Sequence, residues 1–269
     1  MKEQGEKLPV LSEVEQTMLL TLTARAEESA KPNGIIKDTV SEALYAEYKP
    51  HLSMTMDKRA KYGTMIRNVV FDELTKAFIE KNPDGVCIYI GAGLDPRAQR
   101  LDNGKIRWYA VDLPSVINMR NDMMPFERET NIACSIFDSA WIDAVETDGK
   151  SVLIIMEGLL QFFTPEEVRE ALQLIADAYP GAKVILDMLS IHVLNNPKMM
   201  ERISRGLFTF RWGVADAAEV SDMDERYQLL TNINLNDRMA RHKFSMKIMN
   251  KLPKIKRMSS KVALYQIIK

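Results

Sequence analysis

The sequence lacks long apolar runs, a cysteine framework and clustered histidines. No segment of the 269 residues reaches the roughly 18 consecutive apolar residues that a membrane-spanning helix needs. The only two cysteines, Cys87 and Cys134, lie in apolar stretches, which predicts reduced core thiols and excludes a disulfide scaffold. The three histidines are scattered along the chain, so we expect no metal site.

The sequence also lacks an excess of charge of either sign. Its formal net charge is −1, from 36 Lys and Arg against 37 Asp and Glu. Such a chain exerts no global attraction on phosphate backbones or anionic membranes, so we expect neither as a partner. The amphipathic start carries Glu13 and Glu15, and we therefore expect no signal peptide and a cytoplasmic protein. The sequence indicates no particular oligomeric state.

The first third of the chain has the periodicity of helices. Apolar residues recur at intervals of three and four, and the stretches end at breaks that contain Pro or Gly. Ser12, followed three residues later by Glu15, predicts a capping box at the start of the first helix. We interpret residues 1–82 as a helical cap. The helices expected in it cover residues 10–28, 38–48 and 59–81.

Short apolar stretches alternate with helical segments after residue 85. Each stretch is bounded by turn residues, and this alternation predicts a parallel sheet with helices on both faces. The fold class is therefore α/β, with residues 83–269 forming one domain. The expected strands are residues 86–90, 107–111, 132–136, 152–156 and 183–188, with a last strand at 261–269.

The chain between the fifth strand and the last one is polar and rich in methionine. We expect residues 195–250 to be helical in pieces and to fold back over the edge of the sheet, where they would cover the small molecule that the protein acts on. Phe208, Phe210 and Trp212 would form either the apolar wall of a pocket or part of the core. A basic cluster before the last strand lacks interleaved aromatic residues, so we interpret it as a solvated turn. Its members are Lys251, Lys254, Lys256, Arg257 and Lys261.

A glycine turn follows the first expected strand. Gly91 permits a tight turn at the strand exit, and Gly93 lets a ligand approach the backbone without meeting a Cβ. The third glycine of the dinucleotide fingerprint would fall at position 96, which is Pro96. The pattern predicts a nucleoside-binding loop. A nicotinamide-dependent oxidoreductase and a non-catalytic binding protein that keeps the fold remain as alternatives.

Acidic residues follow three of the other expected strands. Asp112 ends the second strand about twenty residues after the glycine turn, where an acid can accept hydrogen bonds from both hydroxyls of a ribose. Asp138 follows the third strand and is placed either to accept from an adenine amino group or to cap a helix. Glu157 follows the fourth. Because the ends of parallel strands share an edge, we expect all three carboxylates on one rim.

Three stretches of the chain together resemble the leucine carboxyl methyltransferase family. They are Gly91-Ala92-Gly93-Leu94-Asp95-Pro96-Arg97, Val111-Asp112-Leu113-Pro114 and Glu157-Gly158-Leu159-Leu160-Gln161-Phe162-Phe163. The nearer match is a bacterial branch that resembles polyketide O-methyltransferases, and the similarity covers residues 35–187. It implies a class I methyltransferase fold, which is Rossmann-like, with seven mostly parallel strands and a C-terminal hairpin. The chain departs from the family at Pro96, usually Thr or Ser, and at Ser139, commonly large and apolar.

The same resemblance implies S-adenosyl-L-methionine as the cofactor. Family members carry an arginine on the helix before the first strand, which meets the carboxylate of the cofactor's methionine part, and Arg67 matches that position. The implied cofactor-binding residues are Arg67, Gly91, Gly93, Asp95, Asp112, Leu113, Asp138, Ser139 and Glu157.

The methyl acceptor decides whether a base is needed. A carboxylate is already ionised at neutral pH, whereas a hydroxyl must lose a proton. Glu157 and His192, which follows the fifth strand, are the candidate catalytic bases near the rim. The sequence thus predicts an O-methyltransferase that acts on a carboxylate or hydroxyl of a small molecule, with polyketide-like compounds among the candidates.

Overall fold

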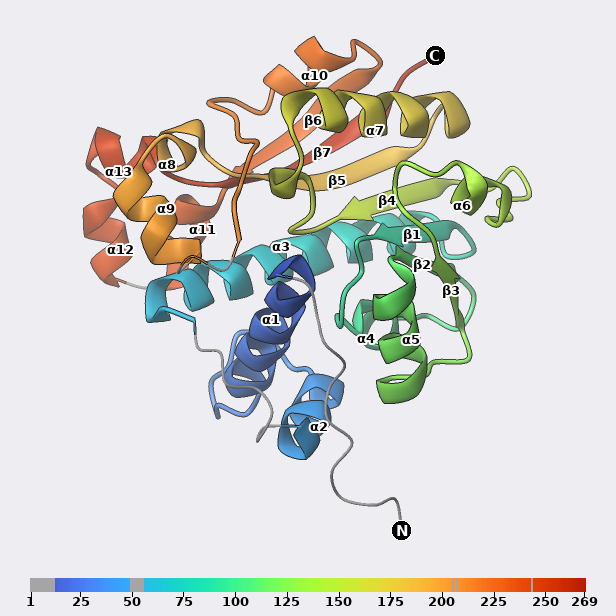
Figure 1. Cartoon of the computed structure of the whole chain (residues 1–269), viewed down its shortest axis with the longest axis horizontal. Helices are drawn as coiled ribbons and strands as arrows, with labels where there is room; N and C mark the ends of the chain where they lie inside the picture. The colour runs from blue at the N-terminus through green and yellow to red at the C-terminus, as the bar shows by residue number, and fades with distance from the viewer. Residues whose placement is uncertain (1–12, 49–55, 205, 207, 243) are drawn as a thin grey trace.

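The computed structural model describes residues 13–48, 56–204, 206, 208–242 and 244–269. Seven strands form one sheet at the centre of these residues (Figure 1). Their order is β3-β2-β1-β4-β5-β7-β6, with β1 to β5 parallel and β7 antiparallel to both of its neighbours. This topology confirms the expected α/β, Rossmann-like fold. The strands are β1 (Val86–Ile90), β2 (Arg107–Asp112), β3 (Glu129–Ala133), β4 (Val152–Met156), β5 (Lys183–Met188), β6 (Tyr227–Asn234) and β7 (Lys261–Ile267).

The strands agree with the sequence-based prediction except at the two edges of the sheet. β3 begins and ends three residues before the expected stretch, and Cys134 and Ile136 lie in the loop after it, buried in the core. β6 lies inside residues 195–250, which the sequence predicts to be helical in pieces, and it pairs antiparallel with β7 as the last two strands of the family do. Both are edge strands that pair with a single neighbour. Their sequences therefore lack the continuous apolar run of a strand that is buried on both faces.

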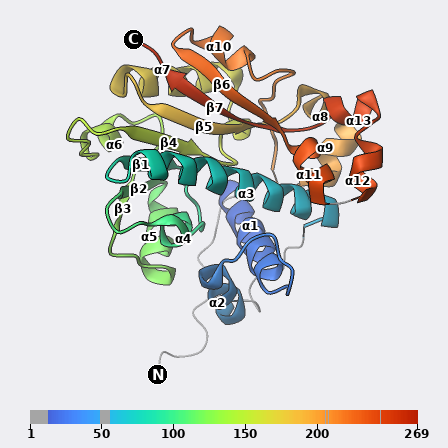
Figure 2. The same cartoon turned by 180° about the vertical axis from the view of Figure 1, so that it is seen from behind.

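Helices cover both faces of the sheet (Figures 1 and 2). Within β1, Tyr89 faces one layer of helices, while Ile88 and Ile90 face the other. Both faces bury apolar side chains, which accounts for the apolar sequences of β1 and β4. One face carries α3 (Lys58–Lys81), α4 (Arg97–Leu101) and α11 (Leu235–His242), and the other carries α6 (Ala140–Asp143), α7 (Pro165–Ala178) and α10 (Glu219–Met223).

The sequence around α7 determines where this helix begins and which face it buries. Thr164 Oγ1 accepts a hydrogen bond from Glu167 N, and the Glu167 side chain accepts one from Thr164 N, which forms a capping box. Buried residues then recur at intervals of three and four and pack against the sheet. They are Val168, Ala171, Leu172 and Ile175.

Two helices form a cap outside the sheet. α1 (Glu13–Ser29) and α2 (Thr39–Tyr48) pack against α5 (Pro114–Met123) in an apolar cluster that is separate from the sheet core. α3 instead lies directly on the sheet, so the described cap consists of α1 and α2. The capping box expected at Ser12 lies outside the described residues.

Four short helices gather at one end of the molecule, beside the N-terminal half of α3 (Figure 1). They are α8 (Ile191–Leu194), α9 (Pro197–Ser204), α12 (Phe244–Met249) and α13 (Pro253–Arg257). Within the described ranges, no helix is long and apolar enough to cross a membrane, and no three His, Cys, Asp or Glu residues group as metal ligands. Cys87 and Cys134 are both buried and free, as expected.

Candidate active site

The carboxyl ends of the five parallel strands meet at one edge of the sheet, where ligands bind in folds of this type. Gly91, Asp112 and Glu157 lie at or just after the ends of β1, β2 and β4, as the sequence predicts, whereas Asp138 lies in the loop five residues after the end of β3. A fifth residue, Asp187, lies near the end of β5 and does not belong to the predicted set. The signal that points to it is an acid within a buried apolar strand, because such groups are rarely buried without a partner.

The turn after β1 has the backbone that its glycines predict. Gly91 and Gly93 have φ angles of +69° and +50°, a region that residues with side chains disfavour. Gly93 N donates to Asp112 Oδ2 at 2.7 Å, and Leu113 N donates to Asp112 Oδ1 at 2.8 Å. Asp112 therefore joins the ends of β1 and β2. A carboxylate can accept about four hydrogen bonds, so this arrangement is compatible with ribose hydroxyls as further donors.

A side chain at either glycine of the turn would crowd a neighbouring side chain. A Cβ at Gly91 would lie 2.9 Å from Leu159 Cδ1, and one at Gly93 would lie 3.3 Å from Met18 Cβ on α1. The cap helix therefore passes directly over the turn. The turn and Asp112 have the groups that a nucleoside requires, and their contact with the cofactor stays a prediction.

The other residues expected to meet the adenosine lie on the surface of the same edge. Leu113 is 43% exposed at the start of α5, and Asp138 and Ser139 are also exposed. Asp138 Oδ1 accepts from Ala140 N at 3.0 Å, at the start of α6, whose N-cap residue is Ser139. Asp138 therefore contacts the first turn of the helix without being its N-cap, and its contact with adenine stays a prediction.

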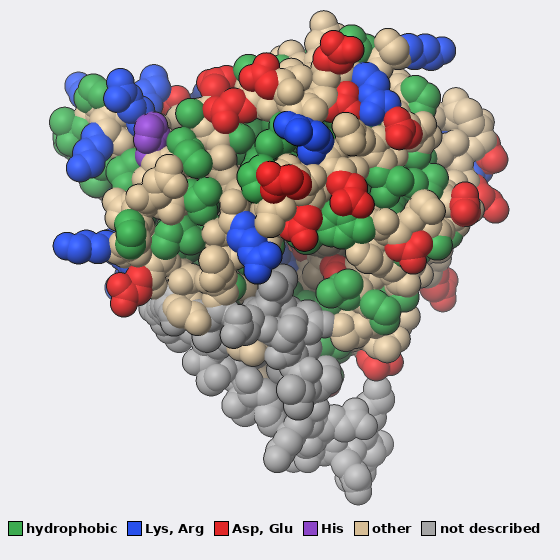
Figure 3. All heavy atoms as spheres, turned by 45° about the horizontal axis from the view of Figure 1, so that its top comes forward, with side chains coloured by type: hydrophobic (Ala, Val, Ile, Leu, Met, Phe, Trp, Pro, Cys, Tyr) green, Lys and Arg blue, Asp and Glu red, His purple; other side chains and the backbone are tan. Residues whose placement is uncertain are grey.

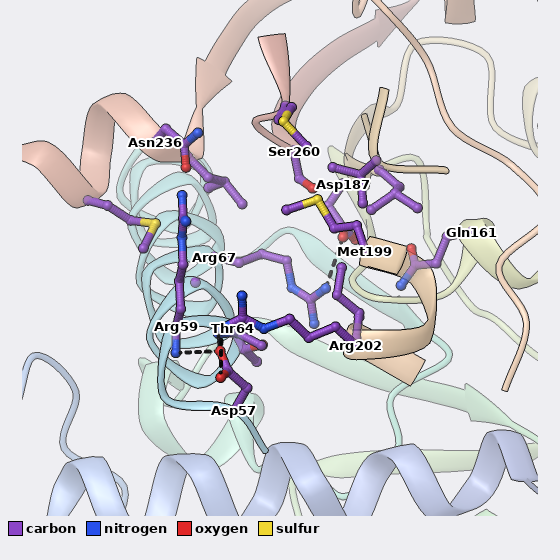
Figure 4. A pocket seen from close by; sticks show the side chains of 18 of the residues that line it. Asp57, Arg59, Thr64, Arg67, Gln161, Asp187, Met199, Arg202, Asn236 and Ser260 are labelled. Carbon is purple, nitrogen blue, oxygen red and sulfur yellow. Dashed lines mark hydrogen bonds and ion pairs between the residues drawn. The ribbon is translucent and has the colours of Figure 1, made fainter. Parts of the chain in front are cut away.

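Arg67 extends from α3 toward the ends of β4 and β5 (Figure 4). Its Nε donates to Glu157 Oε1 and its Nη1 donates to Asp187 Oδ2, each at 3.0 Å. Gly158 makes room for this guanidinium, because a Cβ there would lie 2.9 Å from Arg67 Nη2. The contact of Arg67 with the methionine part of the cofactor stays a prediction.

Asp187 fixes the loop after β4 relative to β5. Its Oδ1 accepts from Gly158 N at 2.6 Å, while its Oδ2 accepts from Arg67. Burial raises the pKa of the Asp187 carboxyl above its usual value, and the adjacent Arg67 opposes that rise. Asp187 is thus a partner of Arg67 that sequence reasoning missed.

Glu157 is held between two arginines. Arg67 contacts its Oε1 and Arg97 contacts its Oε2, and the residue is only 9% exposed. It lines neither of the two cavities described below. These contacts indicate that Glu157 positions Arg67, and they do not support the catalytic base that the sequence suggests.

Asp95 lies at the centre of a buried ion network. Its carboxylate is 2.7 Å from Arg100, 3.2 Å from Arg97 and 4.0 Å from Arg25. Burial disfavours its charged form, but these arginines outweigh that effect and hold the pKa of Asp95 well below its usual range. Arg25 also donates to the Leu94 carbonyl at 2.6 Å, so the network joins α1 to the glycine turn. Asp95 therefore contacts the protein itself, and its predicted contact with the cofactor stays a prediction.

A cavity of about 270 Å³ lies between α3, α9, α11 and α13, on one side of Arg67 (Figure 4). We call it the α13 cavity. Its wall is mostly apolar, with Met199, Met239 and Met258 among the lining residues. Arg59 and Arg202 line it as well, and both are exposed.

A second cavity of about 330 Å³ adjoins the first and is bordered by α1. We call it the α1 cavity. Phe162, Phe208 and Phe210 form an aromatic cluster in its wall, with ring centroids 4.9 to 5.8 Å apart. Trp212 is 2% exposed and packs in the sheet core. The structure thus separates the aromatics of this segment: Phe208 and Phe210 line a cavity, whereas Trp212 is a core residue.

Gln161 lines both cavities from the 3₁₀ turn η2 (Leu160–Phe162). Its backbone carbonyl accepts from Arg211 N at 2.8 Å, which fixes the residue. The side chain is 6% exposed, and its Oε1 has no hydrogen-bond partner within the described residues. A buried amide without a partner is costly, so this group is suited to a ligand in the cavities. Gln161 lies in the stretch Glu157–Phe163 that resembles the family, but nothing in that stretch marks it as a residue that faces a ligand.

His192 lies apart from this arrangement. Its side chain is exposed on α8, its backbone N donates to Ser190 Oγ at 3.2 Å, and it lines neither cavity. The structure therefore does not bring His192 together with the other predicted site residues.

Known relatives of the chain are methyltransferases. The tetracenomycin polyketide synthesis O-methyltransferase TcmP from Streptomyces glaucescens is 29% identical over 211 residues, which is 77% of each chain. The S-adenosyl-L-methionine-dependent methyltransferase dpfgK from Gibberella zeae is 29% identical over 193 residues, 65% of this chain and 64% of its own.

Solved structures share the fold. A candidate methyltransferase from Thermobifida fusca matches with a TM-score of 0.63 over 93% of this chain and 94% of its own, at 14% identity. Magnesium protoporphyrin IX methyltransferase from Synechocystis matches with a TM-score of 0.51 over 85% and 93%, at 12% identity. Residues 18–176 match the family model of leucine carboxyl methyltransferases. The chain therefore belongs to the leucine carboxyl methyltransferase family, as its sequence predicts.

Proposed function

We propose that this S-adenosylmethionine-dependent methyltransferase transfers the methyl group to a carboxylate oxygen of an apolar small molecule. Gly91, Gly93 and Asp112 would hold the nucleoside of the cofactor, and Arg67 would meet its methionine part. The cofactor supplies a methyl group on a positively charged sulfur, so the chain has to align the acceptor and exclude water. The acceptor would occupy the α13 and α1 cavities.

We choose a carboxylate over a hydroxyl as the acceptor group because the described cavity walls offer no available base. Asp57 and Asp187 are the acids among the described lining residues, and each is paired with an arginine, Arg202 at 3.1 Å and Arg67 at 3.0 Å. No histidine belongs to that described lining. An acceptor hydroxyl would need a base, whereas a carboxylate is already ionised. On this account Glu157 and Asp187 position Arg67, and neither takes a proton.

The same lining supports an acceptor with an apolar body. Apolar side chains, methionines and phenylalanines among them, form most of the wall surface, and Arg59 and Arg202 add positive charge that attracts an anion. The relative from Streptomyces glaucescens is named for O-methylation in polyketide synthesis, which supports an acceptor of similar character. We therefore propose an aromatic or polyketide-like carboxylic acid.

The structure favours this function over a nicotinamide-dependent oxidoreductase. The helix after the glycine turn, α4, has only five residues, and Pro96 occupies its N-cap without a side-chain hydrogen bond. A dinucleotide needs a longer helix whose N-terminal N–H groups meet the pyrophosphate.

Transfer of a labelled methyl group tests the proposal. The protein is incubated with methyl-labelled S-adenosylmethionine and a panel of aromatic and polyketide-like acids, each matched to the alcohol or phenol of the same skeleton. We expect label in the acids as methyl esters, which release labelled methanol in mild base. Label that enters only the alcohols or phenols as base-stable ethers would contradict the carboxylate assignment.

A further inference from the structure

Positive and negative residues are unevenly distributed along the chain, although the net charge is close to zero. Residues 238–269 contain ten Lys and Arg and no Asp or Glu. Residues 1–237 therefore hold 26 Lys and Arg together with all 37 Asp and Glu. The expectation that this protein is not attracted to anionic surfaces rests on the total charge, which conceals a basic C-terminal segment.

The structure concentrates this positive charge on one end of the molecule. Figure 3 shows Lys and Arg side chains gathered with hydrophobic ones at the end formed by α12 and α13, with Asp and Glu at the lower border of this end and, mixed with further Lys and Arg, over the rest of that face. In the described part of the chain, none of the basic side chains of this end forms an ion pair. They are Lys247, Lys251, Lys254, Lys256 and Arg257, and all five are exposed.

Large apolar side chains project from the same end. Phe244, Ile248 and Leu252 are 76%, 55% and 58% exposed and follow one another at intervals of four residues. Met246 of α12 is buried instead, against the cluster that includes α3. A single exposed apolar residue is ordinary on a protein surface, but a row of three that is bordered by cations marks an interaction surface. Apolar residues beside lysines are typical of helices that lie in the membrane interface.

We propose that α12 and α13 bind the surface of a membrane that contains anionic lipids. The four lysines and Arg257 meet the lipid phosphates, while Phe244, Ile248 and Leu252 enter the boundary between headgroups and acyl chains. The apolar row favours lipid over nucleic acid. A nucleic acid offers no apolar layer, and its bases stack on aromatic side chains, of which this end provides only Phe244 among its described residues.

Docking in this way would bring the α13 cavity to the lipid. Ile255 of α13 and Met258, directly after this helix, line that cavity, and the same helix carries Lys254 and Arg257. An apolar acceptor dissolved in the bilayer would then be concentrated beside its binding site. This consequence rests on the proposed function, whereas the docking itself does not.

Vesicle sedimentation tests the docking. The full-length protein is mixed with vesicles of phosphatidylcholine alone, or of equal parts phosphatidylcholine and phosphatidylglycerol. We expect binding to the anionic vesicles at low ionic strength and release by salt. Lys251→Gln combined with Lys254→Gln should lower the partition coefficient on anionic vesicles about 25-fold, about fivefold per charge. Ile248→Ser combined with Leu252→Ser should also lower it.

The matched control is Lys76→Gln combined with Lys105→Gln, which removes two exposed lysines remote from α13. This pair should bind vesicles as the wild type does. Absence of binding to anionic vesicles, or an equal loss in the control pair, overturns the proposal. Tighter binding to duplex DNA than to vesicles, unaffected by the two serine substitutions, overturns it as well. Methyl transfer to a water-soluble acceptor should be unchanged in every variant, so a failed sedimentation test leaves the proposed function standing.

Discussion

Asp112 is the residue on which the cofactor assignment depends most. It accepts hydrogen bonds from Gly93 N and Leu113 N, and the proposal adds the ribose hydroxyls as donors. We predict that Asp112→Ala weakens S-adenosylmethionine binding by about 1–3 kcal/mol, because polar partners lose their acceptor. Titration calorimetry measures the change. The control is Asp84→Ala, because Asp84 is an exposed acid just before β1 and so lies at the opposite edge of the sheet. This variant should bind S-adenosylmethionine as the wild type does. Equal affinities of the Asp112→Ala and Asp84→Ala variants would refute the ribose role.

Gln161 offers a test of the acceptor site that is independent of the cofactor. Its buried Oε1 has no partner in the described structure, so Gln161→Leu should not lower the melting temperature. The substitution should raise the KM for the acceptor identified by methyl labelling about tenfold, the value of roughly one hydrogen bond. The affinity for S-adenosylmethionine should stay at the wild-type value. An unchanged KM would place the acceptor away from Gln161.

The sequence identifies single residues where a local pattern requires them. Gly91, Gly93 and Asp112 follow from the strand ends, and the structure joins Gly93 to Asp112 by a hydrogen bond. The pairing of Asp187 with Arg67 and the partners of Asp95 could not be found in this way, because arginines from α3, α1 and α4 reach these acids only after the chain has folded. Glu157 and His192 show the converse limit. Their positions after strands are as expected, but only tertiary contacts reveal that one is held by arginines and that the other faces solvent.

The segment between β5 and β6 supplies part of the cavity walls, and Phe210 tests that assignment. It is half-buried and lines both cavities, whereas Trp212, two residues further on, is 2% exposed in the core. Trp212→Ala should therefore cost about 3–5 kcal/mol of unfolding free energy. Phe210→Ala should cost about 1–2 kcal/mol and alter acceptor turnover. Urea unfolding compares the two, and an equal cost would make Phe210 a core residue.

Strands were predictable where they are buried on both faces of the sheet, because such strands have a continuous apolar sequence. β1, β4 and β5 begin and end where the sequence places them. β3 and β6 are edge strands that pair with one neighbour each, and their alternating or polar sequences do not indicate a strand. The helices around the acceptor cavities are short and meet residues distant in sequence, so their arrangement could not be derived from periodicity.

At the scale of the whole molecule, the two proposed binding regions lie along one edge of the sheet. The glycine turn and Asp112 lie beyond β1 and β2, and the two cavities lie toward β5, β7 and β6. Arg67 lines both cavities and contacts the ends of β4 and β5, so it lies between the two regions. A transferase that joins a cofactor to a separate acceptor requires such an arrangement.

Titration of S-adenosylmethionine into the wild type and into Gly93→Val tests the central claim most directly. A Cβ at Gly93 would lie 3.3 Å from Met18 Cβ of α1, and the positive φ there disfavours any side chain. We expect the larger valine to keep the nucleoside of the cofactor away from the turn as well. The account predicts saturable binding at one site per chain for the wild type, and no binding for Gly93→Val with an unchanged circular dichroism spectrum. A folded wild type that binds no S-adenosylmethionine, or a Gly93→Val variant that binds it with wild-type affinity, would contradict the account.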